Sequence, residues 1–140
     1  MHDANDRSDA PSAAAPTTTA LGRRAEDFAL HHLECAGLQL LARNYRCRGG
    51  EIDLVMLDTA ARVLVLVEVR SRSRADFGRA AATIGFGKQR RISLAARHLL
   101  LSRHELRRLR ARFDVVAIDP PGDRGGAAEV TWIRGAFDAR

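Results

Sequence analysis

Two acidic residues stand inside apolar runs of the kind that form buried strands. The runs cover residues 52–57 and 63–69, and a short polar segment separates them. Asp53 lies one residue into the first run, and Glu68 lies near the end of the second. A carboxylate in apolar surroundings is costly unless it is paired, hydrogen-bonded or bound to a metal ion. Whatever fold the chain adopts must therefore compensate these two acids.

The two runs predict a β-hairpin, and its register follows from the pattern of the side chains. With a five-residue loop, both acids would face apolar partners on opposite faces of the sheet. With a four-residue loop over residues 59–62, or an equivalent bulge, Asp53 faces Glu68 and Glu51 faces Arg70. The other face is then entirely apolar, pairing Met56 with Val65, Leu54 with Val67 and Ile52 with Val69. Because a slip of one residue moves side chains to the other face, the coherent four-residue register is favoured.

That register brings two like charges together. Directly opposed side chains have Cβ atoms about 5 Å apart, and like charges at this distance destabilise a sheet. One acid can respond with a raised pKa. Arg70, two residues beyond Glu68, could relieve the repulsion in a structural Asp–Arg–Glu network. A divalent cation could do the same, and carboxylate oxygens with water suit Mg²⁺ or Mn²⁺. The pattern leaves both alternatives open.

A helix is predicted over residues 20–36, where apolar residues recur at helical spacing and form one face. Thr19 is the predicted N-cap and Gly37 the predicted end. Glu26 falls roughly a quarter-turn from the centre of the apolar face, at about 100° per residue. By spacing alone, a solvated acid is the more common outcome for such a position, and a carboxylate leaning over the sheet edge is the alternative.

The rest of the chain predicts a single α/β domain. The further predicted elements are a short strand at 38–42, a basic loop at 44–50, a helix at about 84–101, and strands at 112–118 and 130–133. The order is helix, three strands, helix and two strands, which indicates a mixed sheet flanked by helices over residues 20–140. Residues 1–19 lack apolar periodicity and are predicted to form a disordered tail.

The charge of the chain indicates a polyanionic partner. Its formal net charge is +6, and its 23 Lys and Arg residues include one lysine, Lys88. A strongly basic small domain is typical of nucleic-acid binding, although an arginine-rich genome would give the same bias. Cys35 and Cys47 lack the spacing of a zinc site or a disulfide framework, so the cytosol is the expected compartment. No stretch approaches the roughly 18 apolar residues of a membrane span.

Five elements in chain order resemble the uncharacterised YraN family of bacteria. They are Ala25-Glu26, GEIDL at 50–54, VEVRSR at 67–72, Lys88, and RFDVV at 112–116. By resemblance that family belongs to the PD-(D/E)XK nuclease-like superfamily and is similar to the archaeal Holliday-junction resolvases. The resemblance covers residues 20–137 and implies a restriction-endonuclease-like core of order α-β-β-β-α-β. The five elements are more specific for the family than for an activity.

The resemblance also implies a catalytic site. Asp53 and Glu68 would ligate Mg²⁺ or Mn²⁺ together with the carbonyl oxygen of Val69. Glu26 would ligate or orient from the first helix, and Arg70 would take the position of the superfamily's lysine. The implied activity is metal-dependent hydrolysis of phosphodiester bonds, in structured or branched DNA more than in RNA. The junction resolvases act as dimers, so a homodimer is expected, although no apolar stripe identifies its face.

One departure from the superfamily pattern weakens the implied activity. Lysine can lose its proton and help to activate water, whereas the guanidinium of Arg70 stays protonated. Lys88 could reach the site from the second helix or contact a phosphate. A catalytically inactive nucleic-acid-binding protein with a nuclease-like fold is therefore the alternative function. The basic residues predicted to contact nucleic acid are Arg46, Arg48, Arg72, Lys88 and Arg91.

Overall fold

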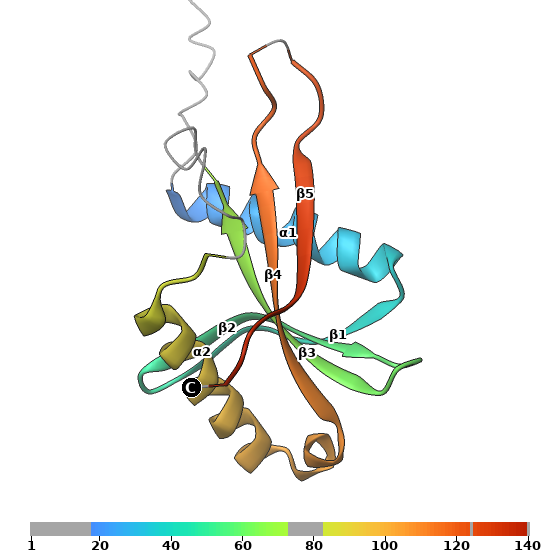
Figure 1. Ribbon diagram of the computed structural model, residues 1–140, viewed down its shortest axis with the longest axis vertical. Helices are drawn as coiled ribbons and strands as arrows, with labels where there is room; N and C mark the ends of the chain where they lie inside the picture. Colours follow the sequence, from blue (N-terminus) through green and yellow to red (C-terminus); the bar gives the residue numbers. More distant parts are fainter. Residues whose placement is uncertain (1–17, 73–82, 124, 140) are drawn as a thin grey trace, which may run out of the picture.

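The protein is a five-stranded sheet with a helix on each face (Figure 1). The computed structural model describes residues 18–72, 83–123 and 125–139. The elements are α1 (Thr18–Cys35), β1 (Leu38–Cys47), β2 (Gly50–Asp58), β3 (Val63–Ser71), α2 (Phe86–Ser102), the short 3₁₀ helix η2 (His104–Arg108), β4 (Arg110–Asp119) and β5 (Glu129–Phe137). The predicted α/β class and element order are confirmed. Up to residue 17, the predicted tail lies outside the described residues.

The strands are arranged in chain order, β1-β2-β3-β4-β5. Among the strands that the structure describes, β3 and β4 are parallel and the other neighbours are antiparallel. Parallel neighbours need a crossover connection, whereas antiparallel neighbours can be joined by tight turns. The crossover between β3 and β4 contains α2. This helix lies on the face of the sheet opposite to α1 (Figure 1). The predicted mixed sheet is thus confirmed.

Alternate residues of the central strands supply two separate cores. The core beneath α1 contains Ala25, Ala29, Leu33, Leu54, Met56, Val65, Val67, Val116 and Ile118. The core beneath α2 contains Ile52, Val55, Leu64, Leu66, Ile92, Ala95, Ala96, Leu99, Leu106 and Phe113. Successive strand residues point to opposite faces, so β3 serves both cores. This burial on both faces explains the continuous apolar run of its sequence.

Several predicted boundaries were wrong. β1 does not end at residue 42 but continues to Cys47, which pairs with Gly50. Most of the predicted basic loop is therefore strand, because the positive φ of Gly49, +79°, allows a turn of only two residues. β5 also extends four residues beyond the predicted end, to Phe137.

The helix ends differ from prediction by one or two residues. The first helix begins at Thr18, so Thr19 lies within it and not at its N-cap. Gly37 follows its end with a φ of +96°, as predicted for a glycine stop. The second helix begins at Phe86 with Gly85 as N-cap, and not at residue 84.

The hairpin register between β2 and β3 is confirmed over its loop and first pairs. A four-residue loop puts Leu57 opposite Leu64, and the ladder continues to Leu54 opposite Val67. It stops there, one position before the two acids would pair. Beyond this point β2 pairs only with β1, and β3 pairs only with β4. The predicted pairing of Ile52 with Val69 was wrong, because Ile52 leaves that ladder and packs beneath α2.

Candidate metal and nucleic-acid site

Asp53 bridges the opening between β2 and β3. Its Oδ2 atom accepts a hydrogen bond of 2.8 Å from the backbone N–H of Val69. The carboxylate thus provides a hydrogen-bond acceptor for the β3 backbone beyond the end of the β2–β3 ladder. Burial raises the pKa of Asp53, while the hydrogen bond from Val69 and the positive charge of Lys88 act in the opposite direction. The predicted meeting of Asp53 with Glu68 occurs at this opening and not within a continuous ladder.

Glu68 is the most poorly compensated group of the site. It is only 8% exposed. Its Oε1 atom lies 3.4 Å from Nζ of Lys88, whereas its buried Oε2 atom accepts no hydrogen bond from a described donor. Glu68 and Asp53 can hydrogen-bond to each other only when one of them is protonated. Burial, and next the charge of Asp53, raise the pKa of Glu68 from 4.5 to about 8. The two acids therefore resist being ionised together.

Lys88 is the cation that faces the acids. It lies in the first turn of α2, and its Nζ donates a 2.7 Å hydrogen bond to Oε1 of Glu51. Burial lowers the pKa of Lys88, but the hydrogen bond to Glu51 and the charges of Glu68 and Glu51 outweigh it, so the pKa is raised. Lys88 therefore keeps its charge. Glu51 also offsets the unfavourable placement of a cation at a helix N-terminus.

The structure places Arg70 away from its predicted partners. The Nη1 atom of Arg70 donates to the carbonyl of Thr83, and Glu51 pairs with Lys88 instead. The predicted pairing of Glu51 with Arg70 and the structural Asp–Arg–Glu network were both wrong. The reason is that the β2–β3 ladder ends at Leu54 and Val67, so β2 no longer pairs with β3 at the position of Arg70.

Glu26 sits at the border between core and solvent, as its helical position predicts. Its Oε2 atom accepts hydrogen bonds from Nδ2 of Asn44 at 3.1 Å and from Nε of Arg43 at 3.4 Å. Arg43 also contacts Asp27, with an N–O distance of 2.6 Å. The charge of Glu26 is one of those that raise the pKa of Asp53, so its carboxylate faces the same region.

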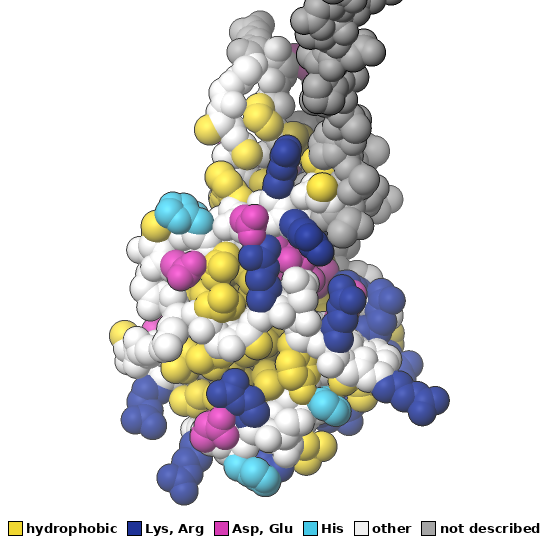
Figure 2. Space-filling model, turned by 180° about the vertical axis from the view of Figure 1, so that it is seen from behind, with side chains coloured by type: hydrophobic (Ala, Val, Ile, Leu, Met, Phe, Trp, Pro, Cys, Tyr) yellow, Lys and Arg dark blue, Asp and Glu magenta, His cyan; other side chains and the backbone are white. Residues whose placement is uncertain are grey.

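The predicted nucleic-acid contacts divide into two groups. Arg46 and Arg48 are exposed at the β1–β2 turn, and Arg91 is exposed on α2. Arg72, in contrast, donates two hydrogen bonds to Asp119, of 2.6 and 2.7 Å. Figure 2 shows one face of the molecule, where Lys and Arg side chains border a smaller group of Asp and Glu side chains. The structure thus brings Arg46, Arg48 and Arg91 toward the β1–β2 turn and holds Arg72 elsewhere.

The acids fit a hard divalent cation. Carboxylate oxygens are the ligands that Mg²⁺ and Mn²⁺ prefer, and the buried Oε2 atom of Glu68 has no described partner. Within the ranges that the structure covers, no group of three or more His, Cys, Asp or Glu side chains could hold a metal ion. Among the described residues, Asp53 and Glu68 are the carboxylates that meet at this site, and they could hold such an ion together with backbone oxygen or water.

Sequence reasoning missed several residues that support the site. Glu51 holds Lys88, and Asn44 with Arg43 holds Glu26. Lys88 itself was named, as the single lysine of an arginine-rich chain, whereas no sequence pattern marked these supporting partners. None of the helices that the structure describes has both the length and the apolar composition needed to span a membrane.

Comparison with known proteins identifies relatives along most of the chain. The model of a family described as "Uncharacterised protein family UPF0102" matches residues 25–118. A UPF0102 protein of Dechloromonas aromatica is 51% identical over 123 residues, covering 88% of this chain and 92% of the relative. A UPF0102 protein of Cupriavidus taiwanensis is 52% identical over 125 residues, covering 89% and 87%. One of Pseudomonas entomophila is 49% identical over 117 residues, covering 84% and 92%.

Proposed function

The chain belongs to the uncharacterised protein family UPF0102, the YraN family, and we propose that it is a metal-dependent nuclease-like protein. It would hydrolyse phosphodiester bonds in structured or branched DNA. One observation carries the proposal. At the point where β2 and β3 separate, Glu68 keeps a buried Oε2 atom without a described partner, beside Asp53. An arrangement that is costly for the protein alone is explained if a cation completes it.

The proposed mechanism assigns each residue of the site a role. Asp53, Glu68 and the carbonyl of Val69 would hold Mg²⁺ or Mn²⁺. When bound, such an ion lowers the pKa of a water molecule and neutralises charge on the scissile phosphate. Glu26, fixed by its hydrogen bonds, would orient groups from the α1 side of the site.

Lys88 supports turnover in spite of the missing lysine of the superfamily pattern. Its ammonium group stays charged between Glu51 and Glu68, so it can hold a phosphate oxygen and stabilise negative charge that develops there. The same protonation means that Lys88 supplies an electrostatic contribution and does not act as a base. Arg70, which donates to the carbonyl of Thr83, would not contact the reacting groups.

A DNA-binding protein without turnover is the second candidate function. The observation that favours it is that Arg70 stands in the place of the pattern's lysine and cannot serve as a base. The two candidates differ only in whether a phosphodiester bond is broken. Both place the protein on nucleic acid, and the cytoplasm and a homodimer remain predictions for both.

The deciding experiment combines metal binding with cleavage. Titration calorimetry with Mn²⁺ and Mg²⁺ is expected to detect binding to the wild type and none to Asp53→Asn. Labelled duplex, single-strand, flap and four-way junction DNA are then incubated with Mn²⁺ or with chelator. Cleavage is expected with Mn²⁺ only, with loss in Glu68→Ala and a reduced rate in Lys88→Ala. Glu34→Gln, an exposed helix acid, is the matched control.

The outcomes separate the alternatives. Metal and DNA binding without cleavage of any substrate would favour the binding-only protein. Unchanged Mn²⁺ binding in Asp53→Asn, or cleavage that persists in Glu68→Ala, would refute the proposed site.

A further inference from the structure

Two neighbouring cavities lie where the β1–β2 turn meets α2. The first has a volume of about 360 Å³ and is lined by Arg46, Cys47, Gly49, Gly50, Glu51 and Arg91. The second has a volume of about 290 Å³ and is lined by Gly49, Gly87, Arg90, Arg91, Leu94 and Arg97. They share Gly49 and Arg91, so they are consecutive parts of one surface. We call this surface, defined by the residues of both cavities, the arginine groove.

Close packing of the turn against α2 builds the groove. A Cβ atom on Gly50 would lie 2.7 Å from the carbonyl oxygen of Arg91 and 2.8 Å from the backbone nitrogen of Ala95. Only glycine therefore allows the turn to approach the helix so closely. Gly87 has no atom within 4 Å of such a Cβ, so the groove is open beside it. The backbone of the turn thus lies directly against the backbone of α2 at Arg91.

The inner end of the groove meets the candidate site. Glu51 lines the first cavity and accepts the hydrogen bond of Lys88, whose Nζ lies 3.4 Å from Oε1 of Glu68. The pKa of Glu51 is lowered mainly by Lys88, and the charges of Arg46 and Arg91 lower it further. The groove's cations and the acids of the site therefore share one electrostatic environment.

The groove is strongly cationic. Arg46, Arg90, Arg91 and Arg97 are all exposed, and none of the four forms an ion pair with another described residue. Its one acid, Glu51, is already paired with Lys88. Guanidinium groups bind phosphates through paired, charge-assisted hydrogen bonds. Four of them along one surface are complementary to an anion that repeats, and not to a single small anion.

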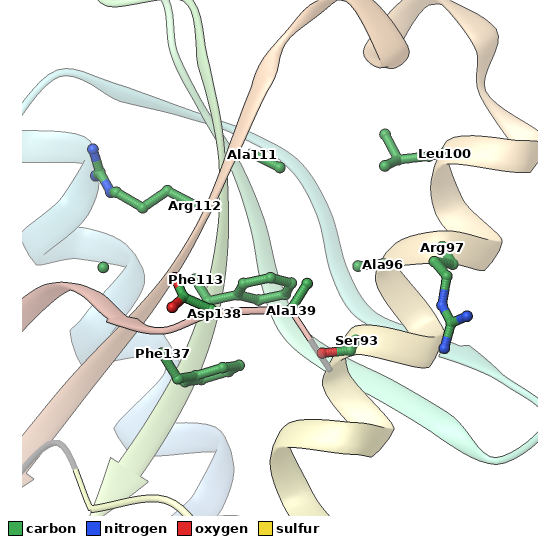
Figure 3. A pocket seen from close by; sticks show the side chains of 11 residues that line it. Ser93, Ala96, Arg97, Leu100, Ala111, Arg112, Phe113, Phe137, Asp138 and Ala139 are labelled. Atoms are coloured by element: carbon green, nitrogen blue, oxygen red, sulfur yellow. The ribbon is translucent and has the colours of Figure 1, made fainter.

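The outer end of the groove is marked by an apolar cavity. Arg97 also borders this cavity, which lies between α2 and β4 and has a volume of about 410 Å³ (Figure 3). Inside it the rings of Phe113 and Phe137 stack with centroids 4.9 Å apart. Its walls are mostly apolar, and the guanidinium of its other arginine, Arg112, is paired with Asp114. The cationic path therefore runs from Lys88 to Arg97, nine residues of α2, or about 14 Å along the helix.

We propose that the arginine groove binds the sugar-phosphate backbone of one nucleic-acid strand leading away from Asp53 and Glu68, independently of base sequence. The inference rests on the proposed function, and it adds the path that the bound nucleic-acid strand takes across the protein surface. Guanidinium donors alone can read the O6 and N7 acceptors of guanine, whereas the donor groups of adenine and cytosine need a side-chain acceptor. The groove offers mainly cationic donors, and its one acid, Glu51, uses its Oε1 atom to accept the hydrogen bond of Lys88.

The test is oligonucleotide binding by the full chain in the presence of chelator. A fluorescein-labelled single strand is titrated at several salt concentrations and followed by anisotropy. The double variant Arg90→Gln/Arg97→Gln removes two groove charges. Each lost phosphate contact lowers the slope of log K against log salt by about 0.7 for single strands. Two contacts predict a slope smaller by about 1.4 and, at 0.1 M salt, a Kd raised about 25-fold.

The matched control is Arg108→Gln/Arg110→Gln, which removes the same charge from exposed positions on η2 and β4. It is expected to change the slope by much less. Equal effects of the two double variants would overturn the groove while leaving nucleic-acid binding intact. If the wild type binds no oligonucleotide, the proposed function fails as well.

Sequence independence has its own test. Oligonucleotides of oligo-dT, oligo-dA and mixed sequence are expected to bind within about threefold of one another, since phosphate contacts carry no sequence information. A preference above tenfold that disappears in Arg90→Gln/Arg97→Gln would show base reading by the groove and overturn this part. Equally effective competition by poly-glutamate of the same charge would show a surface for acidic protein and overturn the assignment to a phosphodiester backbone.

Discussion

Replacing Glu68 by glutamine is expected to change how stability depends on pH. The side chain is buried, its Oε2 atom has no described partner, and its neighbour Asp53 is also an acid. In the metal-free protein, its carboxylate therefore destabilises the folded state at every pH at which it is ionised. Glutamine has nearly the same shape and no charge, so Glu68→Gln removes this destabilisation without opening a cavity.

The magnitude follows from the shift in the pKa of Glu68. Folding raises this pKa from 4.5 to about 8. The folded state thus binds the proton more tightly, and the free energy of unfolding falls as the pH rises from about 4.5 to 8. At about 1.36 kcal/mol per pKa unit, the total loss is about 5 kcal/mol. A buried amide at position 68 can donate to Asp53, and any polar atom that it leaves unpaired costs roughly 1–3 kcal/mol. The variant should therefore be less stable at pH 4.5 and about 2–4 kcal/mol more stable at pH 8.5.

Urea unfolding at pH 4.5, 7 and 8.5 in the presence of chelator measures whether the more stable of the two proteins changes between low and high pH. Glu34→Gln, an exposed substitution on α1, is the control and should leave the pH dependence of the wild type unchanged. Adding Mn²⁺ at pH 8.5 should stabilise the wild type and not Glu68→Gln. A constant difference between Glu68→Gln and wild type at all three pH values would show that Glu68 is already ionised at neutral pH. The account of the buried acid would then be wrong.

Three further substitutions test the packing of the protein. Gly50→Ala should destabilise the protein by roughly 1–3 kcal/mol in urea unfolding, because its Cβ would lie 2.7 Å from the carbonyl oxygen of Arg91. Gly22→Ala, inside α1 with open space around it, should instead stabilise by about 0.5–1 kcal/mol. Asp114→Ala should destabilise by about 3–5 kcal/mol in urea unfolding followed by tryptophan fluorescence. The carboxylate of Asp114 is fully buried and accepts hydrogen bonds from an arginine, from Nε1 of Trp132 and from a backbone N–H.

Each of these has a clear contrary result. A Gly50→Ala protein as stable as the wild type would mean that the turn does not need its close approach to α2. A Gly22→Ala protein that lost stability would contradict the open environment of that helix position. A loss below 1 kcal/mol in Asp114→Ala would show that its hydrogen bonds contribute little to holding β5 against β4.

Local patterns predicted most of the fold. The alternation in β2 and β3 and the four-residue loop fixed the hairpin register, because both depend on residues close together in the chain. The 3.6-residue periodicity found both long helices. Boundaries were wrong where pairing with a neighbour extended a strand. β1 reaches Cys47 because β2 satisfies its backbone to that point, and the polar composition of residues 44–47 gave no sign of this.

The site was predicted in part for the same reason. Asp53 and Glu68 were found because apolar neighbours on a predicted hairpin made them conspicuous. For their compensation the sequence left Arg70 or a divalent ion open and named Lys88 as a residue that could reach the site. The structure places Lys88 beside Glu68, and Arg70 donates to Thr83 instead. Alternation along a strand cannot report that the strands separate at Leu54 and Val67. It also cannot report which residue of a distant helix enters the opening.

The sequence by itself therefore determined that two acids would meet at the end of an apolar hairpin, in a basic α/β domain. This follows from local features of the chain: a loop of four residues joins the two strands, and side chains alternate between the two faces of each strand. Only the tertiary structure decided what faces the acids. The crossover from β3 to β4 lays α2 against the β1–β2 turn, and this packing brings Lys88 to Glu68 and sets the arginines of α2 beside the site. Such contacts join residues more than fifteen positions apart and depend on burial of whole faces, which no local pattern encodes.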